Sequence, residues 1–200
     1  MTSTASKKTP WTPISKYGAL FAVLFVAVLL YFFEHFSESP LSLDAVKEAG
    51  RFDEEKSEVG YLAPDFTLRD LQGNRDGLSN YKGQVLVINF WATWCAPCRV
   101  EMPSFEALYR RYRSQGLAVL AVSLDKGADA KVRQFVQDRG LSFPVLMDVD
   151  GEAERLYPSV SIPFTYVVGR SGRIVARVDG AKDWQSEETF QAVEYLLKHS

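Results

Sequence analysis

The feature that most constrains this chain is a pair of cysteines placed where a buried strand passes into a helix. Residues 85–90 form an apolar run rich in β-branched side chains, which is typical of a strand buried on both faces. Cys95 and Cys98 follow, and they are the only cysteines in the chain. The helical pattern after them puts Cys95 at a helix N-terminus, where unpaired N–H groups and the helix dipole favour a thiolate. This arrangement indicates reversible thiol–disulfide exchange.

Two other uses of a cysteine pair fit the sequence less well. A structural zinc ion takes four ligands, usually Cys or His, and beyond the pair the chain offers only His35 and His199. Two inert buried cysteines are the other alternative. The neighbouring Trp91 and Trp94, together with Pro97 and the helix start, argue against it. We therefore predict a redox-active disulfide and no metal site.

Residues 17–33 form an apolar segment without a charged side chain. A helix of this length spans about 25 Å, the short end of what crosses a bilayer. The segment has no polar face, which argues against a helix buried in a soluble core. Neither a small-residue cleavage site nor a cysteine for lipid attachment follows it. We therefore expect an uncleaved membrane anchor rather than a signal peptide.

The charges around the apolar segment predict its orientation. Lysines precede it and glutamates follow it: Lys7, Lys8 and Lys16 before, Glu34 and Glu38 after. The positive-inside bias predicts a cytoplasmic N-terminus at residues 1–16 and export of everything after the anchor, into an oxidising, periplasmic type of compartment. The acid-rich residues 34–58 are expected to form a solvated linker, with helical turns around 43–49. Residues 59–200 are then the globular domain.

Within that domain, strand patterns alternate with helical ones. The expected strands are 65–68, a run ending near Leu78, 85–90, 117–124, 145–147, 165–168 and 174–178. The expected helices run from the cysteine pair to Gly116 with a kink at Pro103, and over 129–139, 152–157 and 186–198. Such an order, ending in a hairpin and a helix, predicts an α/β three-layer sandwich with a mixed central sheet.

Four ordered motifs give a resemblance to a known family. Residues 90–99, with the sequence FWATWCAPCR, resemble the active site of thioredoxin-fold proteins. Residues 63–68, 101–103 and 162–168 narrow this to the membrane-anchored TlpA/ResA-like thiol–disulfide oxidoreductases of the redoxin group. The resemblance covers residues 59–198. It implies a thioredoxin-like fold with a helix–strand insertion between Leu124 and Pro158.

The motif positions predict catalytic roles for the two cysteines and for a nearby glutamate. Cys95, predicted at the exposed helix tip, attacks a substrate disulfide, and Cys98, one turn in, resolves the mixed disulfide. The resemblance implies that Glu101 tunes the active-site protons, the alternative being an exposed helical carboxylate. Thioredoxin has a buried aspartate where this chain has Asn89, which favours Glu101 as the proton carrier.

The resemblance also assigns substrate contacts to four residues: Trp94, Pro97, Ile162 and Pro163. It implies a cis peptide bond before Pro163, leaving backbone groups free to bind an extended substrate strand. The dipeptide between the cysteines lacks the histidine found in strongly oxidising relatives, so a more reducing potential is expected.

The sequence therefore predicts a membrane-tethered protein-disulfide reductase. By analogy its substrate is the CxxCH pair of apocytochrome c in cytochrome c maturation, or a copper-delivery protein in oxidase assembly. A membrane thiol carrier must re-reduce it, because no nicotinamide or flavin motif is present and no cofactor is predicted. A thiol peroxidase is an alternative, although Thr93 lies two rather than three residues before Cys95. A copper chaperone is disfavoured by the lack of a nearby histidine, and a net charge of −2 gives no sign of nucleic-acid binding.

Overall fold

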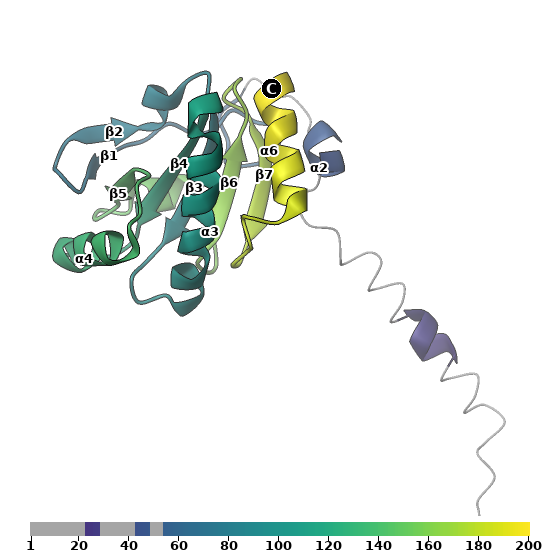
Figure 1. Ribbon diagram of the computed structural model, residues 1–200, viewed down its shortest axis with the longest axis horizontal. Coiled ribbons are helices and arrows are strands. Elements are labelled where there is room, and N and C mark those ends of the chain that lie inside the picture. Colours follow the sequence, from purple (N-terminus) through teal and green to yellow (C-terminus); the bar gives the residue numbers. More distant parts are fainter. Residues whose placement is uncertain (1–22, 29–42, 49–53) are drawn as a thin grey trace, which may run out of the picture. The chain divides into compact units, whose positions relative to one another are not determined.

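The computed structural model describes residues 23–28, 43–48 and 54–200 (Figure 1). The chain divides into two units, Met1–Ser39 and Pro40–Ser200. The predicted cytoplasmic N-terminus and most of the predicted anchor lie outside the described residues. Residues 23–28, inside the predicted anchor, are helical with exposed apolar side chains. Across the described parts of the chain, no helix has both the length and the apolar character needed to cross a membrane.

A seven-stranded sheet forms the centre of the second unit. Its strands are β1 (Thr67–Asp70), β2 (Arg75–Gly77), β3 (Val85–Trp91), β4 (Leu117–Ser123), β5 (Val145–Met147), β6 (Phe164–Val168) and β7 (Ile174–Asp179). They lie in the order β2-β1-β5-β4-β3-β6-β7. The pairs β3–β4 and β4–β5 are parallel and the other pairs are antiparallel, so the predicted mixed sheet is confirmed.

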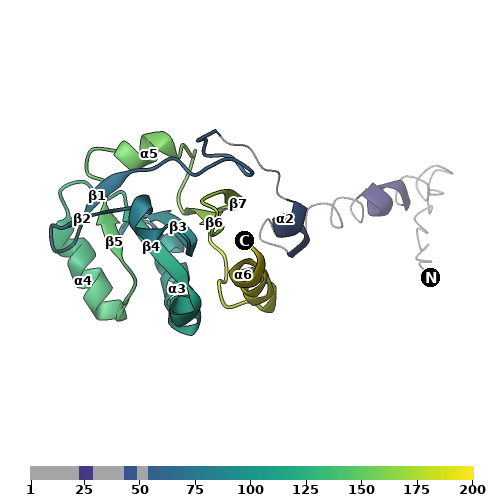
Figure 2. The same ribbon diagram turned by 90° about the horizontal axis from the view of Figure 1, so that it is seen from above.

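The helices cover both faces of this sheet. They are α3 (Ala96–Tyr112), α4 (Asp129–Arg139), α5 (Glu152–Leu156) and α6 (Glu187–His199), with short 3-10 helices at Leu78–Tyr81 and Arg113–Gln115. Figure 2 shows α3, α4 and α6 on one face and α5 on the other, which gives three layers. Helix α3 continues through Pro103 without a break. The predicted insertion between Leu124 and Pro158 contains α4, β5 and α5.

Strand β3 fixes the position of the cysteines because it is buried along its whole length. Its side chains alternate between two apolar clusters, one under α3 and α6 and one under α5. Val87 and Trp91 belong to the first cluster, and Ile88 and Phe90 to the second. The strand lies between β4 and β6, so its carboxyl end, where the cysteine loop begins, is held from both sides.

Part of the range predicted as a solvated linker packs on the domain. The predicted helical turns are found as α2 (Leu43–Glu48). This helix contacts α6 and β7, and Val46 is buried in the core cluster. The Lys47 ammonium lies 5.6 Å from the Tyr195 ring centre. The expectation of a fully solvated linker was therefore wrong for residues 43–48, because one apolar side chain finds a partner surface on α6.

Candidate active site

The two cysteines are joined by a disulfide at the start of α3, with sulfurs 2.02 Å apart. Cys95 is the N-cap residue, and the Cys98 N–H donates a hydrogen bond to Cys95 Sγ at 3.2 Å. A capping side chain makes the same bond at the first turn of a helix. After reduction this donor and the helix dipole would stabilise negative charge on Cys95. The geometry therefore suits the predicted thiol–disulfide exchange.

Cys95 is less accessible than predicted. We expected an exposed sulfur, but Cys95 is only 5% exposed and Cys98 is fully buried. Their neighbours are open, since Trp94 is 69% exposed and Pro97 is also exposed. The loop before β6 causes the burial, because the Ile162 carbonyl oxygen lies 3.7 Å from Cys95 Sγ. A substrate sulfur that reaches Cys95 must therefore come close to Ile162.

The Ile162–Pro163 peptide bond is cis, as the resemblance implied. The backbone around it is only partly free for a substrate. The Pro163 carbonyl accepts a hydrogen bond from the Gly180 N–H at 2.9 Å, so this acceptor is occupied within the domain. The Ile162 N–H has no hydrogen-bond partner in the part of the chain that the structure describes. The backbone groups left to a substrate strand are those of Ile162.

Glu101 is a buried residue of α3, only 3% exposed, and not a surface carboxylate. Its Oε2 accepts hydrogen bonds from Trp184 Nε1 at 3.2 Å and from the Lys182 backbone N–H at 3.3 Å. Its Oε1 accepts one from Asn89 Nδ2 at 2.9 Å. The carboxyl thus joins β3, α3 and the segment between β7 and α6, one helical turn after Cys98.

Burial raises the pKa of the Glu101 carboxyl from 4.5 to about 7, because the charged form loses its hydration. The hydrogen bonds from Trp184, Lys182 and Asn89 act in the opposite direction, since they stabilise the carboxylate and lower the pKa. A carboxyl balanced near pH 7 can take up and release a proton under neutral conditions. This is the property that a proton carrier beside a thiol pair requires.

The sequence analysis did not identify Trp184 and Ser104, which fix the surroundings of Glu101. Trp184 is fully buried, its indole stacks on Phe105 with ring centres 4.5 Å apart, and its backbone N–H donates to Ser104 Oγ at 3.1 Å. Ser104 in turn donates to the Glu101 carbonyl at 2.7 Å. The one available signal was a single tryptophan within the otherwise polar segment between β7 and α6.

A second buried carboxylate fixes the loop before the cysteines and was also missed. Asp125 accepts hydrogen bonds from the Thr93 N–H at 2.8 Å and the Thr93 hydroxyl at 2.6 Å. It accepts a third from the Ser123 hydroxyl at 2.9 Å. Thr93 lies two residues before Cys95, so this carboxylate ties the cysteine loop to the end of β4. An aspartate directly after a buried strand, at the carboxyl edge of the parallel strands, was the available signal.

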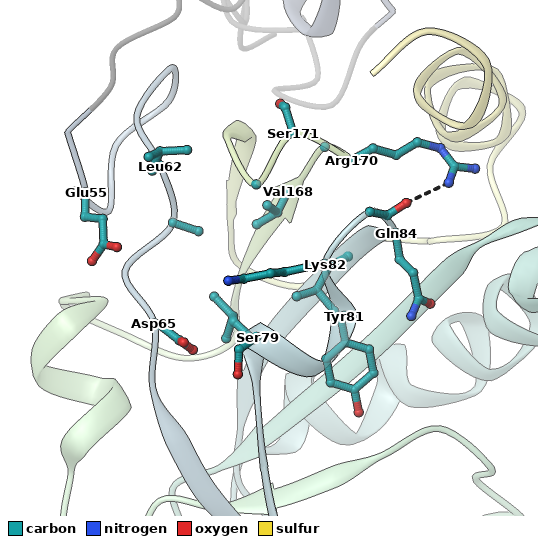
Figure 3. Close-up of a pocket in the computed structure, with 16 residues that line it drawn as sticks. Glu55, Leu62, Asp65, Ser79, Tyr81, Lys82, Gln84, Val168, Arg170 and Ser171 are labelled. Carbon is teal, nitrogen blue, oxygen red and sulfur yellow. Dashed lines mark hydrogen bonds between the residues drawn. The ribbon is translucent and has the colours of Figure 1, made fainter.

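A hollow of about 370 Å³ lies at the opposite end of β3 from the disulfide. Figure 3 shows the Lys82 side chain extending into it. The Arg170 guanidinium donates to the Gly83 carbonyl at 2.8 Å. The same guanidinium also donates to the carbonyls of Gln115 at 3.0 Å and Leu197 at 3.3 Å. These contacts hold loops and α6 together, and none of them involves the cysteine site.

The fold and the cysteine pair define a class, the thioredoxin-like enzymes that exchange disulfides with proteins. A family model described as the AhpC/TSA family matches residues 59–177, and the chain belongs to this family. Thiol-disulfide oxidoreductase ResA of Bacillus thuringiensis subsp. konkukian (strain 97-27) is 35% identical over 145 residues, which cover 72% of this chain and 80% of the relative. ResA of Oceanobacillus iheyensis is 42% identical over 127 residues, 62% of this chain and 66% of the relative.

Solved structures of thiol–disulfide oxidoreductases are also similar to this chain. A thiol:disulfide interchange protein assigned as DsbE, from Chlorobium tepidum, is similar with a TM-score of 0.64 and 29% identity, over 72% of this chain and 99% of that one. StoA from Bacillus subtilis is similar with a TM-score of 0.55 and 26% identity, over 66% of this chain and 96% of that one. The predicted resemblance to ResA-like oxidoreductases is confirmed, and the chain is a thiol–disulfide oxidoreductase of this type.

Proposed function

We propose that this oxidoreductase works as a membrane-tethered reductase on the outer face of the cytoplasmic membrane, with the CxxCH disulfide of apocytochrome c as its substrate. The observation that carries the exchange chemistry is Glu101, a buried carboxyl with a pKa of about 7, one helical turn after Cys98. The reducing direction rests on the Ala96-Pro97 dipeptide, which lacks a histidine. The tether and its orientation rest on the apolar residues 17–33 and the lysines before them.

Reduction proceeds in two exchange steps. The Cys95 thiolate attacks one substrate sulfur, forming a mixed disulfide and releasing the other substrate sulfur as a thiolate, which takes a proton. The Cys98 thiolate then attacks Cys95 Sγ, which forms the Cys95–Cys98 disulfide and releases the second substrate thiol. Two electrons pass to the substrate. A dithiol carrier in the membrane returns them, and is itself oxidised to a disulfide.

Glu101 serves the second step. Cys98 is fully buried, so its thiol must lose a proton without direct access to water. The Glu101 carboxylate accepts that proton and releases it later, which a carboxyl with a pKa near 7 can do at neutral pH. Asn89, Trp184 and Lys182 donate to the carboxylate and hold it in place while its charge changes.

Trapping of mixed disulfides tests this function. Cys98→Ala in the full chain should capture substrates on Cys95, because the resolving thiol is gone while the attacking thiol remains. Cys95→Ala is the matched control and should capture little, since Cys98 is buried. Apocytochrome c on Cys98→Ala supports the proposed substrate. Recovery of copper-delivery proteins alone would keep the reductase mechanism and move it to oxidase assembly. Peroxide consumption by the wild type with no captured protein would refute the proposed function.

A further inference from the structure

A larger hollow, of about 690 Å³, opens beside the disulfide. Its walls are the cysteine loop at Thr93 and Trp94, the segment from Leu124 to Lys131, and the loop from Ser159 to Ile162. Ile162 is also the residue whose carbonyl lies 3.7 Å from Cys95 Sγ. The hollow therefore offers room for a polypeptide whose disulfide reaches Cys95.

Two large apolar side chains beside the hollow are exposed. Trp94 is 69% exposed, and Val160 is fully exposed on the loop before the cis-proline. Apolar side chains in such a position, next to a reactive group, are typical of surfaces that bind another polypeptide. They can cover an apolar side chain that a substrate presents near its disulfide.

Two cationic side chains line the same hollow. Lys126 and Lys131 are exposed, and neither makes an ion pair with any residue of 54–200. The carboxylate between β4 and these lysines, Asp125, is buried and is already occupied by hydrogen bonds from Thr93 and Ser123. Both ammonium groups are therefore available to a carboxylate that enters from outside.

Acidic side chains near the hollow make its charge uneven. Glu154 of α5 also lines the hollow. A neighbouring hollow of about 580 Å³ shares Trp94 and Lys131 with it and is also lined by Arg99 and Asp138. Asp138 accepts a hydrogen bond from Gln134 at 2.6 Å. A substrate carboxylate is thus attracted by Lys126 and Lys131 and repelled by Glu154.

We propose that this hollow is a substrate subsite selecting polypeptides with an apolar residue and an acidic residue beside the reacting disulfide. The apolar side chain packs on Trp94 and Val160, and the carboxylate lies near Lys126 and Lys131. The inference rests on the proposed reductase function and adds a sequence preference to it. Because the attraction is electrostatic at an exposed site, it is expected to be modest and to weaken as salt is added.

The test compares four synthetic peptides that share one cyclic CxxC disulfide. They carry Leu-Glu, Leu-Gln, Leu-Lys or Ser-Glu beside it, and the reduced full chain in detergent reduces them under second-order conditions. The wild type should reduce the Leu-Glu peptide roughly three- to tenfold faster than the Leu-Lys peptide at low salt. The Leu-Gln peptide should fall between them, and the Ser-Glu peptide should be slower than the Leu-Glu peptide.

The double variant Lys126→Gln/Lys131→Gln should lose the preference among the Glu, Gln and Lys peptides. The matched control Lys82→Gln/Lys198→Gln makes the same change in net charge away from the hollow, and should keep it. Val160→Ser, at a fully exposed position, should weaken the preference for leucine over serine, while Trp94 keeps part of it. Reduction of 2,2′-dipyridyl disulfide, a small neutral substrate, should be equal in all variants and report intact thiols.

Two negative results have different meanings. Equal reduction of all four peptides by the wild type would overturn the subsite and leave the reductase standing. The same conclusion would follow if the control variant lost the charge preference as fully as the double lysine variant. If the wild type reduces dipyridyl disulfide but no peptide, the proposed reductase function fails, and the subsite fails with it.

Discussion

Replacing Glu101 by glutamine should change how the stability of the domain depends on pH. The carboxyl has a pKa of about 7 in the folded protein, against 4.5 as its ordinary value. Between these values the folded protein binds a proton that the unfolded chain has released. The free energy of unfolding therefore falls as the pH rises, until both states are ionised above the folded pKa. Glu101→Gln removes this dependence because glutamine does not titrate.

The magnitude follows from the shift in pKa. Because Glu101 is only 3% exposed, solvent screening reduces the effect little. A displacement from 4.5 to about 7 corresponds to about 3 kcal/mol between full protonation and full ionisation. Between pH 5 and pH 8 the wild type should lose about 2.5 kcal/mol through this group, and the variant should not. The difference between the two proteins isolates Glu101 from every other titrating residue.

The glutamine can be accommodated at this position. Its carbonyl oxygen can accept from Trp184 and Lys182, as Oε2 of Glu101 does. Its NH₂ group would face the Asn89 amide, which can turn round to present its oxygen. Asn89 Oδ1 is buried and has no hydrogen-bond partner in the described part of the chain, so it is available as that acceptor. The variant is therefore expected to fold.

Urea denaturation at pH 5, 6, 7 and 8 measures the effect on residues 40–200, which form a compact unit. The protein is kept oxidised, because cysteines in a disulfide do not titrate and cannot add their own pH dependence. Wild type and Glu101→Gln should diverge steadily from pH 5 to pH 8. Parallel curves for the two proteins would refute a raised pKa at Glu101 and, with it, the proposed proton carrier.

Three further outcomes are expected. Trp184→Phe keeps an aromatic ring against Phe105 but removes the N–H that lowers the pKa of Glu101, so that pKa, followed by carboxyl NMR, should rise. Arg170→Met removes guanidinium bonds to three backbone carbonyls and should lower the free energy of unfolding by about 1–3 kcal/mol. The control Arg69→Met, which loses one exposed bond, should cost under about 0.5 kcal/mol in the same urea titration. Asp125→Asn weakens the tie to the cysteine loop and should slow peptide-disulfide reduction by roughly tenfold while far-UV circular dichroism stays unchanged.

The sheet could be predicted because its central strands are continuous apolar runs, which is how parallel strands buried on both faces look in a sequence. The first hairpin was placed less accurately. We expected strands at 65–68 and up to Leu78, but β1 and β2 are Thr67–Asp70 and Arg75–Gly77. Asp70 sets these bounds, because its carboxylate accepts from the N–H groups of Gln72 and Asn74 at 2.8 Å each. Residue propensities do not reveal which aspartate will make such a turn.

The site was predictable where its residues are neighbours in the sequence or belong to the family motifs, as the cis Ile162–Pro163 bond does. The cysteines and Glu101 lie within seven consecutive residues at the start of α3. Trp184 reaches Glu101 from 83 residues away, and Asp125 reaches the cysteine loop from 32 residues away. The burial of Cys95 was missed for the same reason, since Ile162 is 67 residues distant. Contacts of this kind depend on the packing of whole elements, which no local pattern contains.

In the proposed mechanism, the surroundings of Glu101 connect proton transfer to thiol chemistry. Burial favours the neutral carboxyl, and three donors favour the carboxylate, so the pKa lies near 7 instead of far to either side. A carboxylate one turn after Cys98 opposes a second negative charge on the buried sulfur, while a neutral carboxyl does not. We therefore propose that one proton is shared between the two groups. Ionisation of the Cys98 thiol is easiest when Glu101 takes up its proton in the same event, which is the step that resolves a mixed disulfide. The glutamine of Glu101→Gln cannot accept that proton. The substitution should therefore slow the resolution of the mixed disulfide by Cys98 more than the first attack by Cys95.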